Sequence, residues 1–140
     1  MDWPLIEQKL ESLRRSLRRV KEKCPQDADT LEKDYDAQDI LSLNLTRAVQ
    51  LCVDIGAHII ASTDFPAPDT MGQTFDVLNE IGIISAELAG RMKKTVGFRN
   101  LAVHNYAAIN WAIVHNIAHS HLTDFEDFAK AVVKTQEMRA

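Results

Sequence analysis

Apolar residues recur at helical spacing through most of the chain. From residue 5 to about 24 they return every three or four positions, while arginine and lysine fill the opposite face. Pro25 has no N–H to donate and restricts the residue before it, so this first helix is predicted to end there. The apolar positions are Ile6, Leu10, Leu13, Leu17 and Val20.

A second apolar pattern, over residues 31–59, predicts one long helix. Asp27 or Asp29 is expected to cap its first turn, because a carboxylate there accepts from free backbone N–H groups. The segment 62–70 contains two prolines and ends this helix. A short helix is expected near 74–81.

The next helix is predicted to begin after Ser85, as its N-cap, and to end near His104 or the following asparagine. Two more helices are expected over 109–119 and 124–138, the latter capped by Thr123. No useful stretch of β alternation and no repeat is present. The pattern predicts an all-α fold, an antiparallel bundle of four or five helices.

Length and composition indicate an ordinary globular protein. The 140 residues suit a single domain, 1–140, and hydrophobic residues make up 46% of them. The two cysteines, Cys24 and Cys52, cannot build a disulfide scaffold and are expected to be reduced thiols with small packed side chains. With no signal peptide and no apolar run near the roughly 20 residues that span a bilayer, we expect a cytoplasmic protein without membrane contact.

The net charge of −4 hides an asymmetry. No acidic residue occurs between Glu87 and Asp124, a stretch that holds Arg91, Lys93, Lys94 and Arg99. This stretch predicts a local positive field that would attract a polyanion, although chance clustering around a buried helix gives the same pattern. Lys93 and Lys94 are candidate phosphate or RNA contacts, or equally solvated lysines.

Two other charged clusters are expected to face solvent. The arginines of Arg14–Arg19 suggest nucleic-acid binding, but pairing with Glu11 and Glu22 on a solvated helix face is the favoured interpretation. The segment Asp27–Asp39 holds six acids, which fit an exposed helix surface or a contact for a basic partner.

Four polar side chains with complementary chemistry lie in the segment 98–106. Arg99 and His104 are five residues apart, about 140° and about 7.5 Å along a helix, so they converge only if both lean toward one cleft near the helix end. Asn100 shares a helix face with His104, and Tyr106 follows just beyond. Leu101 and Val103, between these residues, are expected to face the core.

Imidazole moves protons near neutral pH, and guanidinium binds phosphate bidentately. This pair suits cleavage of an RNA phosphodiester without a metal, and a second copy of the chain would supply the second acid–base group. A dimer is also suggested by the stretch from Asn100 to Thr123, which bears no formal charge and is rich in apolar residues. Such a stretch is either core or buried in an interface.

The pattern Arg99-Asn100-x3-His104-x-Tyr106 is similar to the R-x4-H-x-Y motif of the HepT-like toxins, a branch of the HEPN superfamily. The segment 54–60, Asp-Ile-Gly-Ala-His-Ile-Ile, resembles the second-helix segment of that family, and Gly97-Phe98 its usual approach to the motif. The resemblance covers nearly the whole chain.

The resemblance implies a HEPN-like bundle that acts as a metal-independent endoribonuclease toxin and a homodimer, with RNA as its substrate. Arg99 and His104 would be catalytic, and Asn100 would support the site. The implied partner is a nucleotidyltransferase antitoxin of the MntA kind, an MNT-domain protein that neutralises the toxin by transferring AMP from ATP to Tyr106. No cofactor is implied.

Two alternatives use the same residues differently. In a non-catalytic nucleotide- or RNA-binding module, Arg99 would hold phosphate and His104 would donate a hydrogen bond. In a protein-interaction bundle, the uncharged stretch would dock a partner. Taken singly, Arg99 also fits a cation that stabilises a helix C-terminus, His104 a core imidazole, and Tyr106 a packed aromatic ring.

The remaining histidines are not expected to hold a metal. His115 and His119 have the i, i+4 spacing that zinc uses on helices, but no glutamate follows His115 and no acid lies nearby as a third ligand. We therefore expect no metal site. His58, on an apolar face, is expected to be a hydrogen-bonded structural histidine.

Overall fold

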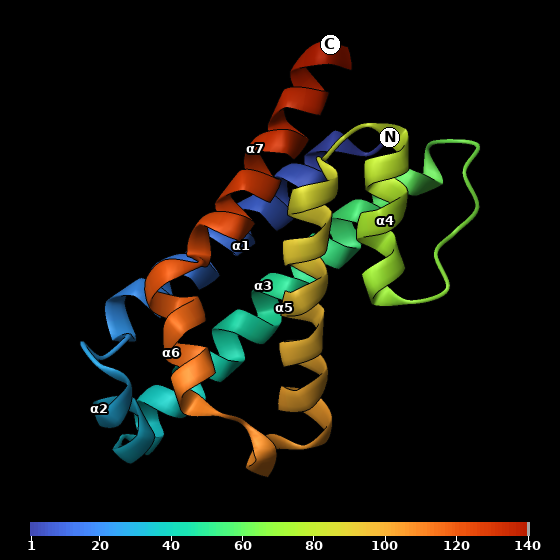
Figure 1. The fold of residues 1–140 in the computed structure, drawn as a ribbon. Coiled ribbons are helices and arrows are strands. Elements are labelled where there is room, and N and C mark those ends of the chain that lie inside the picture. Colours follow the sequence, from blue (N-terminus) through green and yellow to red (C-terminus); the bar gives the residue numbers. More distant parts are fainter. Residues whose placement is uncertain (140) are drawn as a thin grey trace.

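Seven α-helices and one 3₁₀ turn make up the part of the chain that the computed structural model describes, residues 1–139 (Figure 1). Within those residues there is no β-strand, so the prediction of an all-α fold is confirmed. The elements are α1 (Trp3–Lys23), α2 (Ala28–Lys33), α3 (Tyr35–Ala61), α4 (Met71–Ile81), α5 (Ala86–His104), η1 (Tyr106–Ala108), α6 (Trp111–Ser120) and α7 (Leu122–Arg139).

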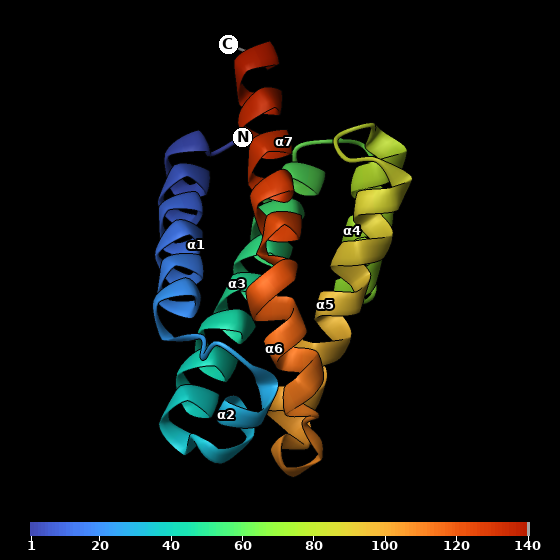
Figure 2. The ribbon, with the colours of Figure 1, turned by 60° about the vertical axis from the view of Figure 1, so that its left-hand side comes forward.

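The helices form an antiparallel bundle around α3. This helix runs through the middle, with α1 on one side and α4 and α5 on the other (Figure 2). The chain then turns through η1 and returns along α6 and α7, while the short α2 packs against α6 (Figure 2). The arrangement places the end of α5, the turn η1 and the first turns of α3 at the same end of the bundle (Figure 1).

The prediction of one helix through residues 31–59 was wrong, because Asp34 interrupts it. Asp34 ends α2 and begins α3, and its carboxylate accepts a 3.0 Å hydrogen bond from the N–H of Ala37. An aspartate gains more from capping free N–H groups than from continuing a helix, in which its propensity is low. Asp27 caps α2 in the same way, accepting from Thr30 N–H at 2.8 Å, as predicted.

Most other helix ends follow the sequence. Ser85 caps α5, accepting from the N–H of Leu88 at 3.1 Å, and α5 ends at His104. Thr70 caps α4, which therefore begins three residues earlier than predicted. Thr123 was predicted to cap the last helix, but α7 begins at residue 122 and includes Thr123, so that prediction was wrong.

Helices α3 and α4 approach closely at Gly56. A Cβ at this position would lie 2.6 Å from Cγ2 of Thr74 and 3.0 Å from Cδ1 of Leu78. Only a glycine lets these side chains pack against the backbone of α3. Gly90, on α5, has nothing within 4 Å of the same hypothetical atom.

Helix α3 is long and apolar enough, by length and composition, to cross a membrane, and within residues 1–139 it is the one helix that passes this test. Its 18-residue apolar window is 56% buried inside the bundle, as expected for the core helix of a globular protein. The predicted surface clusters are also present. Arg14 pairs with Glu11 at 3.2 Å and Arg19 with Glu22 at 3.4 Å, and the six acids of residues 27–39 are exposed.

Candidate active site

One continuous segment carries the four motif residues. Helix α5 presents Arg99, Asn100 and His104 in its last two turns. Asn105 ends the helix with a non-helical backbone, and its N–H donates to the carbonyl of Leu101 at 2.8 Å. Tyr106 then begins η1. The last turns of α5 and the turn η1 lie at the end of the bundle that also holds the first turns of α3 (Figure 1).

Arg99 is half-buried and incompletely paired. Its Nη1 donates to Oδ1 of Asn100 at 3.1 Å, so Asn100 orients the guanidinium. Its Nε is buried and has no hydrogen-bond partner among the described residues. A buried N–H of a permanent cation without an acceptor is costly, and a phosphate oxygen would satisfy it once the guanidinium turned toward solvent.

His104 is exposed, one helical turn after the exposed Asn100. No hydrogen bond or ion pair within residues 1–139 joins His104 to Arg99, so their convergence on one cleft stays a prediction. Leu101 is half-buried toward the core, as predicted, but Val103 is 50% exposed. The expectation that Val103 faces the core was wrong, because only one side of α5 still has a packing partner near its end.

Tyr106 is held by α3 and α6. Its hydroxyl donates a 2.6 Å hydrogen bond to the carboxylate of Asp39, and its ring meets Trp111 edge-on at 5.7 Å. Burial, followed by the hydrogen bond to Asp39 and the charge of Asp39, raises the pKa of Tyr106 to about 12, while a hydrogen bond from Ser42 acts in the opposite direction. The hydroxyl is therefore neutral at physiological pH.

No motif or spacing in the sequence predicted that Asp39 lies at this site. It lies 67 residues before Tyr106, in an acidic run expected to face solvent or a basic partner. Only the antiparallel return of the chain brings the first turns of α3 beside η1. The acidic run was visible in the sequence, but it did not indicate which of its carboxylates would contact Tyr106.

The positive field expected for the acid-free stretch is weaker in the folded structure than the sequence indicates, because acidic residues pair with two of its four cations. Arg91 contacts Glu87, Asp124 and Asp127, with the N–O distance to Asp124 at 2.9 Å. Lys93 pairs with an aspartate of α4, Asp76, at 3.0 Å. These two cations are neutralised by acids from other segments, so a role for Lys93 in RNA contact has little support.

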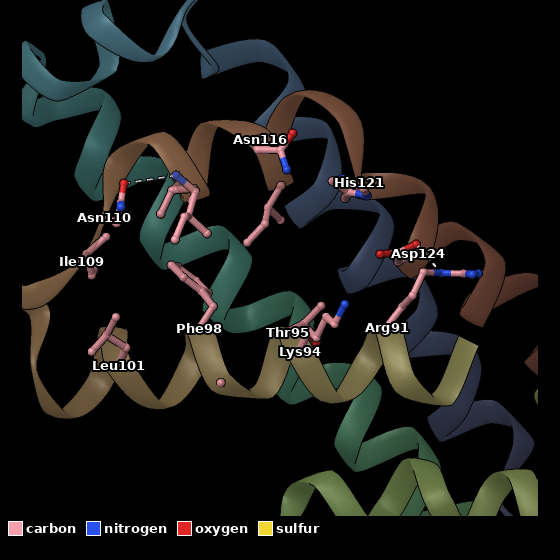
Figure 3. Close-up of a pocket in the computed structure, with 14 residues that line it drawn as sticks. Arg91, Lys94, Thr95, Phe98, Leu101, Ile109, Asn110, Asn116, His121 and Asp124 are labelled. Carbon is pink, nitrogen blue, oxygen red and sulfur yellow. Dashed lines mark hydrogen bonds and ion pairs between the residues drawn. The ribbon is translucent and has the colours of Figure 1, made fainter. Parts of the chain in front are cut away.

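Lys94 and Arg99 are the cations of that stretch that form no ion pair within the described residues. Lys94 is exposed on α5 and lines a cleft of about 470 Å³ between α5 and α6, whose floor is apolar (Figure 3). Phe98 and Leu101 form one wall, and Asn110 and Asn116 lie on the other (Figure 3).

Neither Arg99 nor His104 lines this cleft. In the single chain the motif thus lies beside the apolar cleft between α5 and α6 and not within it. The uncharged stretch divides between two environments. Ile109 and Val114 are buried in the core, whereas Ile113 and Tyr106 are 57% and 40% exposed.

The other sequence candidates lie elsewhere. His58 is half-buried on α3, and burial raises the pKa of the fully buried Cys52 thiol. The histidine pair of α6 lies against the turn after α1, because Nε2 of His115 is 2.8 Å from the carbonyl oxygen of Pro25.

Comparison with known proteins gives one consistent result. A family described as "Ribonuclease HepT-like" matches residues 13–132. The curated mRNA nuclease HepT of Shewanella oneidensis is 32% identical over 128 residues, which are 91% of this chain and 96% of that protein.

Solved structures agree with the sequence matches. A toxin–antitoxin crystal structure with AMP-PNP has a TM-score of 0.87 at 32% identity, over 94% of this chain and 98% of that one. Tri-AMPylated Shewanella oneidensis HEPN toxin, in complex with MNT antitoxin, has a TM-score of 0.85 at 33% identity, over 93% and 96%. YutE, a cytosolic protein of Bacillus subtilis, shares the fold with a TM-score of 0.86 at 17% identity, over 99% and 93%. The bundle, the motif and these matches agree, and the chain belongs to the ribonuclease HepT-like family of HEPN toxins.

Proposed function

We propose that this chain is a metal-independent endoribonuclease toxin that cuts RNA with Arg99 and His104. The observation that supports the proposal most strongly is the half-buried guanidinium of Arg99, whose Nε has no acceptor among the described residues. In a protein of a ribonuclease family, a phosphate of the substrate is the natural acceptor. The site of action of such a toxin is the cytoplasm, where RNA is its target.

In the proposed chemistry, His104 transfers protons and Arg99 provides a permanent positive charge. The imidazole of His104 accepts the proton of the ribose 2′-hydroxyl, whose oxygen then attacks the adjacent phosphorus. The 5′-oxygen leaves with a proton from an imidazolium, which yields a 2′,3′-cyclic phosphate. Arg99 offsets the charge that develops on the phosphorane, and Asn100 holds the guanidinium in place through the 3.1 Å hydrogen bond.

In-line displacement needs an acid and a base on opposite sides of the phosphorus, and one chain offers a single exposed motif imidazole. A homodimer would supply the second. The exposed apolar residues Val103 and Ile113 lie on the uncharged stretch that follows Arg99, which suits an interface between two copies. Such an interface would bring two copies of the motif to one groove.

We propose that a nucleotidyltransferase antitoxin of the MNT type neutralises this activity by transferring AMP to Tyr106. Solved relatives include a HEPN toxin that is tri-AMPylated and bound to MNT antitoxin. The hydroxyl of Tyr106 would give up its proton, for which Asp39 is the nearest acceptor, and its oxygen would bond to the α-phosphorus of ATP as pyrophosphate leaves. The added phosphate would repel RNA and would compete for Arg99.

The test of catalysis is cleavage of RNA by the pure protein in excess EDTA. Wild type should cut, whereas Arg99→Ala and His104→Ala should each lose about 10²-fold or more in rate. His121→Ala, which removes another exposed imidazole of the same acid-free stretch, is the matched control and should cut normally. If His104→Ala still cuts at the wild-type rate, the assignment of His104 is wrong.

RNA binding by the same variants separates the enzyme from the alternatives. If the protein is an enzyme, His104→Ala should still bind RNA without cutting it. A non-catalytic binding module predicts binding but no cleavage by wild type, and a protein-interaction bundle predicts neither. Intact mass after co-expression with an MNT antitoxin should show added AMP on wild type and none on Tyr106→Phe.

A further inference from the structure

A cysteine from the end of α1 and two histidines from α6 come together as a cluster of metal-ligating side chains. One ligand atom from each of Cys24, His115 and His119 lies within 4.8 Å of the others. Cys24 ends α1, and the two histidines lie one turn apart on α6 with their rings stacked, the centroids 5.4 Å apart. We propose that Cys24, His115 and His119 form a binding site for a transition-metal ion of the Zn²⁺ class.

The donor set fits this class of ion. Zinc is bound by thiolate sulfur and imidazole nitrogen in tetrahedral geometry, with bonds of about 2.0–2.3 Å that place ligand atoms about 3.5 Å apart. The present separations, up to 4.8 Å, therefore require the side chains to move by only about 1 Å. Three protein ligands leave a fourth position for water. Carboxylate-preferring ions such as Mg²⁺ find no oxygen ligand in this set.

A backbone carbonyl orients one of the ligands. Nε2 of His115 lies 2.8 Å from the carbonyl oxygen of Pro25. When Nε2 donates its proton to that oxygen, Nδ1 carries the lone pair and would be the nitrogen that binds the metal. Histidines that bind metals usually donate their other N–H to a carbonyl or carboxylate in this way, which fixes the tautomer and the ring.

The surroundings of the cluster also bear on binding. Cys24 is half-buried, and burial raises the pKa of its thiol, so its sulfur carries a proton. A divalent ion would displace that proton, as thiol ligands are deprotonated on binding.

A metal here would add a link between two parts of the bundle that are otherwise held by side-chain packing and by the hydrogen bond between His115 and Pro25. Cys24 precedes α2, and α2 packs against α6 (Figure 2). The ion would fasten the turn between α1 and α2 to α6. Neither Arg99 nor His104 belongs to the cluster, so this role is separate from RNA cleavage and compatible with cleavage in a chelator.

The test measures metal binding by the full chain and does not involve activity. Protein stripped with a chelator is dialysed against Zn²⁺ or Co²⁺ alone, and bound metal is counted by elemental analysis. We expect one ion per chain, a near-ultraviolet thiolate-to-cobalt absorption band, and a Tm that rises and saturates with zinc. Cys24→Ser should abolish the band and weaken binding at least tenfold.

His119→Ala is the second variant, because His119 is exposed and its loss leaves the core unchanged. It should also weaken binding at least tenfold, whereas His121→Ala, two residues away and outside the cluster, should bind as wild type does. Absence of a bound ion in the wild type would overturn the proposal. So would an affinity that His119→Ala and His121→Ala lower equally, or a cobalt band that persists in Cys24→Ser.

Discussion

The contact between Tyr106 and Asp39 makes a quantitative prediction about the phenol. The pKa of Tyr106 is raised from 10.0 to about 12, first by burial and then by the hydrogen bond to Asp39 and its negative charge. Asp39→Asn keeps an acceptor oxygen but removes the charge. Because burial is the largest cause and remains, we expect the pKa to fall by up to about one unit and to stay above 10.

The measurement is a spectrophotometric titration of tyrosinate. The chain has two tyrosines, so Tyr35→Phe as the background leaves Tyr106 as the single phenol. Asp36→Asn is the matched control, because Asp36 is an exposed aspartate one turn earlier on α3 and its loss changes the net charge equally. The reasoning fails if Asp36→Asn lowers the pKa as much as Asp39→Asn does, or if Asp39→Asn leaves it unchanged.

Three further outcomes test the packing and the ion pairs. By urea denaturation, Gly90→Ala should raise the free energy of unfolding by about 0.5–1 kcal/mol. Gly56→Ala should be about 1–3 kcal/mol less stable than Gly90→Ala, because its new Cβ would be too close to Thr74 and Leu78. Asp124→Ala, which leaves Arg91 without its best-buried partner, should cost about 1–3 kcal/mol, whereas Asp127→Ala should stay within about 0.5 kcal/mol. Because the folded pKa of Tyr106 is raised, its neutral hydroxyl stabilises the fold fully below pH 10, and this contribution is lost toward pH 12. The stability of wild type relative to Tyr106→Phe should therefore fall over that interval.

The sequence predicts the elements of this fold well and their boundaries less well. The helical period of about 3.6 residues and the N-caps at Asp27 and Ser85 depend on neighbouring residues only, and the structure confirms the helices and both caps. Asp34 was missed because its flanking apolar residues keep the helical period across a break of a single residue. Thr123 was chosen because it is a good cap by type, but α7 had already begun.

The site is predictable only as far as it is local. The order of Arg99, Asn100, His104 and Tyr106 is fixed by one helix and the turn after it, and the motif could be recognised in the sequence. Asp39 and Cys24 reach their neighbours from 67 and 91 residues away. Spacing along the chain carries no information about such contacts, which depend on how α1, α3 and α6 pack.

The number of cations in the acid-free stretch also differs from the number left without an ion pair in the fold, and this difference matters for RNA binding. The stretch without acids has four cations, but acids from other segments pair with Arg91 and Lys93, and only Lys94 and Arg99 stay unpaired within the described residues. For a single strand, the logarithm of the binding constant falls by about 0.7 per contacted phosphate for each tenfold rise in salt. Two cations therefore give a slope of about −1.4 and a dimer about −2.8, against about −5.6 if all eight cations of two chains bound phosphate. A measured slope near the last value would mean that the ion pairs of α5 open to receive RNA. A slope near −2.8 would mean that the substrate is held by few charges and that correct placement of the strand depends on the joining of two chains.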